Sequence, residues 1–294
     1  MSVADSNPLA WSLLLAAARF ARDGLHRDRL ARFGFSQGRL QPQTDGPLEW
    51  HPASGWRLVV AAAGADLGDA TALLPLCSAG PTQPLVIGQL GQSLDGFIAT
   101  EKGDSCYVTG EEGLVHLHRL RALSDAVIVG AATVANDDPR LTTRRVEGHN
   151  PLRVVLDPAG RLPGSHRVWN DAAPVLRLCA TLACDAAGAI RLANNVETQF
   201  LPGSQLDPSA VLSLLHERGC VTVLVEGGGR TVSAFLSAGL LDRLHLVVAP
   251  LLIGAGRAGI RLPPREPLGA CLRPAVQVHA LGGDTLFDCD LRVR

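Results

Sequence analysis

From residue 84 onward, short apolar runs alternate with segments of helical periodicity, and this alternation constrains the fold more than any other feature. Residues 125–130 (DAVIVG) form a continuous apolar run, as is typical of a strand buried on both faces of a sheet. Residues 111–123 carry leucines at helical spacing. The pattern predicts an α/β fold with a mostly parallel sheet and helices on both faces. Further strands are expected at 85–90, 153–157, 174–180, 196–201, 221–225, 244–249, 275–279 and 286–291, and further helices at 208–218 and 231–238.

Residues 1–83 have a different character and are predicted to form a small N-terminal extension to a main domain at 84–294. A helix is expected at 8–22, because Asn7 and Pro8 resemble a helix cap followed by proline at the first helical position. Residues 24–52 contain many glycines and prolines and little periodicity, so no element is predicted there. A short strand is expected at 56–61, a short helix near 70–74 and a linker at 78–84.

Charge, apolar runs and cysteine usage exclude several classes of partner. The formal net charge is −1, so there is no basic excess for a phosphate backbone, and nucleic acid is not expected as a partner. No apolar run reaches the roughly 20 residues needed to span a bilayer, so no membrane partner is expected either. The seven cysteines are scattered without a C-x-x-C pair, which argues against a zinc site and favours a reducing, cytoplasmic location.

Two glycine-rich segments could approach a bound nucleotide. In residues 225–231 (VEGGGRT) a strand ends, three glycines follow and a helix begins. Free amides at a helix N-terminus favour an anion such as a pyrophosphate, although a tight strand-to-helix turn would explain the same residues. Residues 254–259 (GAGRAG) match the spelling of a dinucleotide-binding motif, but Pro263 and Pro264 prevent a long helix after them. Residues 254–259 are therefore predicted to be a loop.

In a parallel sheet, ligands bind beyond the carboxyl ends of the strands, so acids in those loops are candidates for chemistry. Asp95 follows the first strand of the main domain. Residues 136–139 (NDDP) follow another strand, and Asp138 is expected to be extended because a proline comes next. Paired acids there could be helix caps, metal ligands or acceptors for ribose hydroxyls. The loops to examine first are those after residues 90, 130 and 225.

Basic side chains near the predicted strand ends could bind a phosphate. Arg121, Arg144 and Arg153 are the candidates, since a guanidinium group can bind two oxygens of one phosphate. His116 and His118 lie two residues apart on one predicted helix and do not face each other, so they cannot form a helical metal pair. No metal site is predicted.

Segments 93–99 (SLDGFIA), 120–144 (LRALSDAVIVGAATVANDDPRLTTR), 151–157 (PLRVVLD) and 225–252 (VEGGGRTVSAFLSAGLLDRLHLVVAPLL) occur in one order and spacing. Together they resemble the reductase domain of riboflavin biosynthesis, and the resemblance spans about residues 84–294. It implies a dihydrofolate-reductase-like fold, NADPH as cofactor and a homodimer. The implied reaction reduces the ribosyl group of 5-amino-6-(5-phosphoribosylamino)uracil to an open ribityl chain.

Carried over by position, the resemblance implies contacts to both ligands. The phosphorylated pyrimidine substrate would be contacted by Ser105, Arg121, Leu141, Arg144 and Glu226. NADPH would be contacted by Gly91, Tyr107, Thr133 and Asp137, and by the turn and helix start at Gly228, Gly229, Arg230, Thr231 and Val232. Asp95 and Glu226 are the candidate proton donors, and water is a third.

Three positions depart from the family pattern and leave the substrate open. Gln89 stands where the family usually has lysine, Tyr107 replaces a tryptophan, and Pro158 replaces a serine that could contact the cofactor. A reductase of the same fold acting on another pyrimidine, a pterin or a natural-product intermediate is therefore an alternative. A non-catalytic nucleotide-binding protein is another. The H-x-E and P-C-x-x-C motifs of the deaminase often fused to this domain do not occur, so no deamination is expected.

Overall fold

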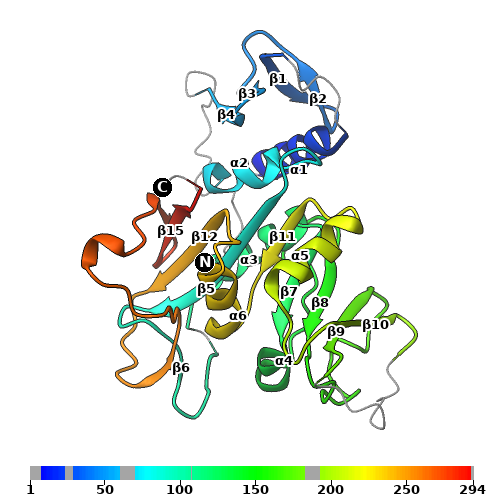
Figure 1. Ribbon diagram of the computed structural model, residues 1–294. Coiled ribbons are helices and arrows are strands. Elements are labelled where there is room, and N and C mark those ends of the chain that lie inside the picture. The colour runs from blue at the N-terminus through cyan, green and yellow to red at the C-terminus, as the bar shows by residue number, and fades with distance from the viewer. Residues whose placement is uncertain (1–7, 24–28, 60–69, 107, 183–192, 293–294) are drawn as a thin grey trace.

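The computed structural model describes residues 8–23, 29–59, 70–106, 108–182 and 193–292. Its centre is a nine-stranded sheet in the order β10-β9-β8-β7-β11-β5-β12-β15-β14 (Figure 1). The strands from β10 to β12 run parallel, and β15 and β14 add an antiparallel edge. The strands are β5 (Leu85–Ser93), β7 (Ala126–Gly130), β8 (Leu152–Leu156), β9 (Val175–Ala180), β10 (Val196–Leu201), β11 (Thr222–Val225), β12 (Arg243–Ala249), β14 (Ala275–Leu281) and β15 (Asp284–Asp290).

Helices cover both faces of this sheet, which confirms the predicted α/β architecture. Leu224 of β11 contributes to the core that also holds Leu120 of α3, whereas Val223 and Val225 contribute to the core with Phe235 of α6. This alternation follows from the two-residue period of a strand, which places successive side chains on opposite faces. In the described segments no helix has both the length and the apolar character needed to cross a bilayer. The helices of the main domain are α3 (Glu111–Leu123), α4 (Ala131–Asp137), α5 (Pro208–Glu217), α6 (Gly229–Ser237) and a 3-10 turn at Leu268–Ala270.

The N-caps of the helices differ in a way that bears on ligand binding. Asp207 caps α5: its side chain accepts a hydrogen bond from Ser209 N at 3.1 Å, and Pro208 occupies the first turn. The caps of α3 and α6 are Gly110 and Gly228, which have no side chain to bond the first-turn amides. Those amides are therefore open to another acceptor.

The N-terminal unit contains more structure than the sequence predicted. It consists of α1 (Pro8–Asp23), an antiparallel sheet in the order β2-β1-β3-β4, and α2 (Ala70–Ser78). The expectation of no element at 24–52 was wrong, because three of these strands lie there. The predicted strand at 56–61 is shorter, and its last two residues fall outside the described segments. The strands are β1 (Ala31–Ser36), β2 (Arg39–Pro42), β3 (Leu48–His51) and β4 (Gly55–Leu58).

An aromatic cluster explains why these short strands are stable. The rings of Phe20, Phe33, Trp50 and Trp56 meet edge to face or tilted, with centroid separations between 4.9 and 6.1 Å. Such pairs contribute beyond the area they bury. Phe20 comes from α1 and the other three rings come from the strands, so the cluster joins segments that are distant in sequence.

The N-terminal unit packs directly on the main domain. Arg22 of α1 donates to Leu123 O at 2.6 Å and forms an ion pair with Asp125 at 3.3 Å. Trp11 Nε1 donates to Glu147 O at 2.9 Å. Figure 1 places this unit at one end of the sheet, and α4 and β6 (Phe97–Thr100) at the opposite end. The extension therefore contacts the end of α3 and the loop before β8.

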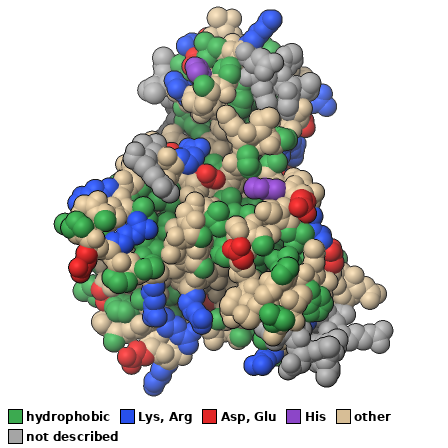
Figure 2. Space-filling view, viewed as in Figure 1, with side chains coloured by type: hydrophobic (Ala, Val, Ile, Leu, Met, Phe, Trp, Pro, Cys, Tyr) green, Lys and Arg blue, Asp and Glu red, His purple; other side chains and the backbone are tan. Residues whose placement is uncertain are grey.

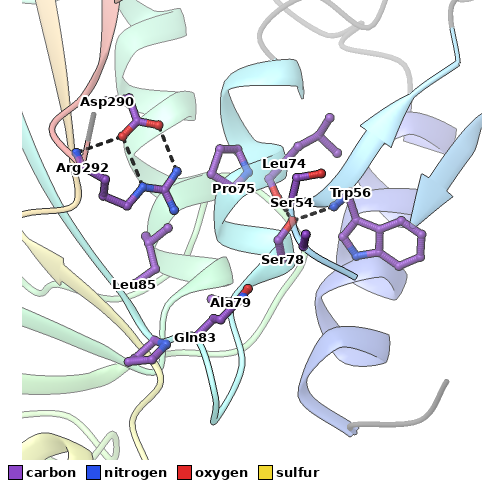
Figure 3. A pocket seen from close by; sticks show the side chains of 12 residues that line it. Ser54, Trp56, Leu74, Pro75, Ser78, Ala79, Gln83, Leu85, Asp290 and Arg292 are labelled. Atoms are coloured by element: carbon purple, nitrogen blue, oxygen red, sulfur yellow. Dashed lines mark hydrogen bonds and ion pairs between the residues drawn. The ribbon is translucent and has the colours of Figure 1, made fainter. Parts of the chain in front are cut away.

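A cavity of about 480 Å³ lies between the N-terminal unit and the start of β5 (Figure 3). Trp56 and Pro75 line it on one side, and the ion-paired Asp290 and Arg292 line it on the other. Leu85, the first residue of β5, also lines it, so this cavity is remote from the carboxyl ends of the parallel strands.

Candidate active site

The carboxyl ends of β5, β7 and β11 meet at one edge of the sheet, because these strands are parallel and β11 pairs with both others. Glu226 directly follows β11, and its amide donates to Ile128 O of β7 at 3.0 Å. Gly91 lies near the end of β5, where an added Cβ would come within 2.6 Å of Thr109 Cγ2. The predicted ligand-binding loops therefore converge. Figure 2 shows basic side chains gathered on the surface where Figure 1 places β6 and the start of α6.

A buried ion pair joins α3 to this edge. Arg121 Nε and Nη2 donate to the two carboxylate oxygens of Glu226 at 2.9 and 2.6 Å, and both side chains are less than a tenth exposed. Arg121 Nη1 also donates to Thr142 O at 3.2 Å. Two residues predicted to contact substrate are thus brought together and bonded to each other. Their contact with substrate stays a prediction.

The segment after α4 presents Arg144 at the same edge. Leu141 is buried and left-handed, with φ of 59°, so any ligand contact there is limited to its backbone. Arg144 Nη1 donates to Thr142 Oγ1 at 2.8 Å, and the side chain has no acidic partner among the described residues. Burial lowers the pKa of the Arg144 guanidinium, which marks a site of uncompensated positive charge. Neighbouring charges lower this pKa further, and they belong to Arg121, Arg140, Arg167 and Arg145.

The glycine turn between β11 and α6 leaves its backbone accessible. Gly227 has a φ of 105°, a conformation that favours glycine over other residues. Gly228 N donates to Thr133 Oγ1 at 2.8 Å, which links the turn to α4. Thr133 was predicted as a cofactor contact, and the structure places it against the predicted phosphate turn.

The first turn of α6 is closely packed from behind. A Cβ on Gly229 would lie 1.8 Å from Gly259 O, so only glycine fits without movement of that loop. Arg230 is exposed, and Thr231 lies beside Gly130, where an added Cβ would come within 2.5 Å of its hydroxyl. Val232 is fully buried in the core. Any contact of Val232 with a cofactor is therefore limited to its backbone.

Substitution at Gly228 tests whether this turn holds a cofactor phosphate. Gly228→Val is expected to weaken cofactor binding roughly tenfold or more, because a side chain at the N-cap pushes an anion away from the first-turn amides. An added Cβ at Gly228 would meet only Thr133 Oγ1, at 3.1 Å. Titration of reduced-nicotinamide fluorescence measures the affinity. Gly269→Val, at a position with open space around it, is the control. Unchanged affinity in Gly228→Val would remove the turn from the site.

The predicted loop at 254–259 forms the back wall of the turn. No helix opens there, as expected, but the loop contains a short strand, β13 (Gly256–Ala258), which pairs antiparallel with β6. Neither strand was predicted. A Cβ on Gly256 would lie 2.1 Å from Ala99 O, so the glycines of this run allow close approach of β6 and β13.

Asp137, a predicted cofactor contact, and Ser105, a predicted substrate contact, are adjacent in the structure. Ser105 Oγ donates to Asp137 Oδ1 at 3.1 Å. Burial raises the pKa of Asp137, while the hydrogen bond from Ser105 and the charge of Arg257 act in the opposite direction. Within the described residues, no group of three or more His, Cys, Asp and Glu is placed to hold a metal ion. Tyr107 lies outside the described residues.

Asp95 is tied to the loop behind β6. Its carboxylate accepts hydrogen bonds from Ser93 Oγ, from Gly254 N at 2.6 Å and from Ile253 N at 3.1 Å. The hydrogen bond from Ser93 lowers the pKa of Asp95, and those from the two amides lower it further. The group is therefore ionised at neutral pH and holds the 253–254 loop, which does not suit a proton donor.

Two sequence expectations near the site need correction. Arg153 is not a phosphate ligand: its side chain is fully buried at the start of β8 and bonds Asp171 and Arg140 O. Asp138 is not extended: it has φ of 41° and ψ of 54° as the C-cap of α4. Its Oδ1 accepts from the amide of Arg167 at 2.8 Å, and this long-range contact explains a conformation that local sequence did not predict.

Sequence reasoning missed one residue of the site. His118, considered only as a metal ligand, accepts a hydrogen bond from Arg144 N on its Nδ1 at 3.0 Å. Its position one helical turn before Arg121 placed both on one face of α3, and that spacing was the available signal.

Comparison with known proteins identifies the main domain. The model of the RibD C-terminal domain family matches residues 84–284. A 2,5-diamino-6-ribosylamino-4(3H)-pyrimidinone 5′-phosphate reductase from Methanothermobacter thermautotrophicus is 37% identical over 175 residues, covering 58% of this chain and 80% of the relative. The riboflavin biosynthesis protein RibD of Chlamydia muridarum is 35% identical over 215 residues, covering 70% of this chain but only 57% of the relative.

Solved structures agree with the sequence relatives. A Thermotoga maritima diaminohydroxyphosphoribosylaminopyrimidine deaminase/5-amino-6-(5-phosphoribosylamino)uracil reductase is 27% identical, with a TM-score of 0.61 over 75% of this chain and 59% of that one. RibD of Acinetobacter baumannii is 28% identical, also with a TM-score of 0.61, over 75% and 61%. This chain thus spans less than two thirds of these two proteins. The chain belongs to the RibD C-terminal domain family, whose members are pyrimidine reductases with a dihydrofolate-reductase-like fold.

Proposed function

We propose that this protein reduces the ribosyl group of 5-amino-6-(5-phosphoribosylamino)uracil to a ribityl chain in riboflavin biosynthesis, with NADPH as the cofactor. The observation that carries the proposal is the presence of two sites suited to anions at one sheet edge. Arg144 has no acidic partner among the described residues, and Gly228 is the N-cap of α6 and has no capping side chain. One site suits a substrate phosphate and the other the pyrophosphate of a dinucleotide.

The net change requires one hydride and one proton. Opening of the ribosyl ring gives a C1′=N bond; hydride adds to C1′, and the proton goes to nitrogen. The nicotinamide cofactor supplies the hydride, and the protein aligns donor and acceptor and excludes water. The open surroundings of Gly228, where an added Cβ would meet only Thr133 Oγ1, support a backbone cradle on the cofactor side. Arg230, exposed in the first turn of α6, supports the phosphate-bearing form NADPH over NADH.

Within this proposal, Arg144 binds the substrate phosphate and Glu226 lies at the wall of the pyrimidine site. Arg121 orients Glu226 through the paired hydrogen bonds. Of the two candidate proton donors, Glu226 is favoured by its place beside the ends of β7 and β11, because Asp95 is engaged by the 253–254 loop. Water remains the third candidate. The homodimer and the cytoplasmic location stay predictions.

A second substrate has a specific observation in its favour. The Methanothermobacter relative, of which this chain covers 80%, is named for the 2,5-diamino pyrimidinone that still carries its amino group at position 2. Gln89, which replaces the usual lysine, is 8% exposed on β5 next to the site. A neutral amide there suits either a carbonyl or an amino group, because it both donates and accepts hydrogen bonds.

Steady-state oxidation of NADPH and of NADH, supplied with each of the two phosphorylated pyrimidines, tests the proposal. The expected result is a higher kcat/KM with NADPH and with the uracil. A preference for the diamino pyrimidinone would move the substrate to the second candidate. Binding of NADPH without turnover of either compound would contradict the proposed reaction.

A further inference from the structure

His118 is a buried histidine beside Arg144, the candidate phosphate ligand, and the proposed reaction assigns it no role. It lies on α3 with only 3% of its surface exposed. Arg121 follows it by three residues, so both side chains, which are buried, lie on the same face of the helix. The loop that carries Arg144 packs against this face.

The contact of His118 is with the backbone of that loop. Its Nδ1 lies 3.0 Å from the amide nitrogen of Arg144, and an amide can only donate. Nδ1 is therefore the unprotonated acceptor, and the ring proton is on Nε2. Burial lowers the pKa of His118 to about 3, with further lowering by Arg121, Arg144 and Arg145. The His118 ring is thus neutral at physiological pH, and its Nδ1 can accept the hydrogen bond from the Arg144 amide.

The side chain of Arg144 is held from a second direction. Its Nη1 donates to Thr142 Oγ1 at 2.8 Å, and Thr142 O in turn accepts from Arg121 at 3.2 Å. In the described part of the molecule, no other nitrogen of the Arg144 guanidinium has a partner. The Nε and Nη2 atoms form the edge that can bind two oxygens of one phosphate. Backbone and side chain are therefore both fixed, and the binding edge is left open.

We propose that His118 is a positioning residue, which orders the Arg144 backbone before substrate arrives and so sets the affinity for the substrate phosphate. The inference rests on the proposed function and deepens it. Without the acceptor, the loop must become ordered on binding, and the free energy of ordering is subtracted from the affinity. The effect is expected mainly on phosphate binding, because the hydrogen bond is made to the backbone amide of Arg144, the candidate phosphate ligand itself.

A pair of matched substitutions separates this role from simple packing. His118→Leu keeps much of the volume and removes the acceptor, whereas His118→Asn places an oxygen close to the position of Nδ1. His118→Leu is expected to raise the KM of the phosphorylated substrate about three- to tenfold, the value of one hydrogen bond. The KM of the dephosphorylated substrate and of NADPH should stay within about twofold. His118→Asn should restore most of the loss.

His116→Leu is the control for loss of a buried histidine contact on the same helix. His116 Nε2 lies 2.9 Å from His245 Nδ1 of β12. This variant is expected to lose thermal stability without discriminating between the two substrates. If His118→Leu raised the KM of both substrates equally, or if His118→Asn gave no recovery, the positioning role would be wrong.

Two measurements without turnover keep this test independent of the proposed reaction. Amide exchange of peptide 141–150 should be faster in His118→Leu than in His118→Asn in the free protein. Calorimetry would compare the binding of ribose 5-phosphate with that of ribose. The affinity of the protein for ribose 5-phosphate should fall only in the His118→Leu variant. If both results were obtained but neither pyrimidine were turned over, the positioning role of His118 would stand and the proposed substrate would be wrong. Unchanged exchange and unchanged ribose 5-phosphate binding would overturn the positioning role.

Discussion

Glu226→Ala is expected to lower the free energy of unfolding by about 3–5 kcal/mol and to abolish reduction. The reason is the position of Arg121, whose side chain is 7% exposed and whose guanidinium donates to both Glu226 oxygens. Removing the carboxylate leaves a buried charge without its partner, and desolvation of that charge is not offset. Urea unfolding followed by circular dichroism measures the stability.

A double variant separates the structural role of this pair from its role in the reaction. Arg121→Met with Glu226→Leu replaces both charges by apolar groups of similar size, and such replacements are often close to neutral for stability. We expect this protein to unfold near the wild-type midpoint but to remain inactive. A stable and active double variant would show that the pair only supports the fold. A single Glu226→Ala variant as stable as wild type would contradict the burial argument.

Arg144→Ala is expected to weaken binding of the phosphorylated substrate by about 1.5–3 kcal/mol, the range for hydrogen bonds to a charged group. That loss corresponds to a roughly 10- to 150-fold increase in KM. The reason is that Arg144 brings an uncompensated charge to the site, since its described contacts are with Thr142 and His118 rather than with an acid. Initial rates at saturating NADPH measure the effect.

The dephosphorylated substrate provides the internal control for Arg144. If Arg144 binds the phosphate, the wild type and Arg144→Ala should handle that compound alike. The matched substitution is Arg161→Ala, an exposed arginine whose amide bonds Asp157 and which is not among the charges acting on Arg144. Equal loss of affinity for NADPH and for substrate in Arg144→Ala would contradict the assignment.

The parallel sheet could be predicted because its central strands contain continuous apolar runs that are recognisable in the sequence. β7 and β11 are buried on both faces, and this burial requires the continuous apolar runs that the sequence shows. β1 and β2 lack that signal, because most of their exposed positions are polar and their buried face is completed by aromatic residues from α1 and β4. The stability of the N-terminal unit therefore depends on contacts that no local pattern reveals.

The site was predictable in its parts and less so in its connections. The glycine turn was singled out because glycines between a strand and a helix indicate an anion site, and Arg144 because of its residue type and the family resemblance; their ligand contacts stay predictions. Arg153 was misassigned because the same residue type at the start of a strand points into the interior, where it bonds Asp171. His118 was missed as an acceptor because its partner amide is 26 residues away and only the fold brings them together.

Transfer of deuterium tests the central claim most directly. The purified protein would be incubated with NADPH deuterated at the transferable C4 position and with the phosphoribosylaminouracil, and the product analysed by mass spectrometry. The account predicts a ribityl product with one deuterium at C1′, from one face of the nicotinamide only. A ribityl product without deuterium at C1′, or no ribityl product while NADPH remains bound, would contradict it.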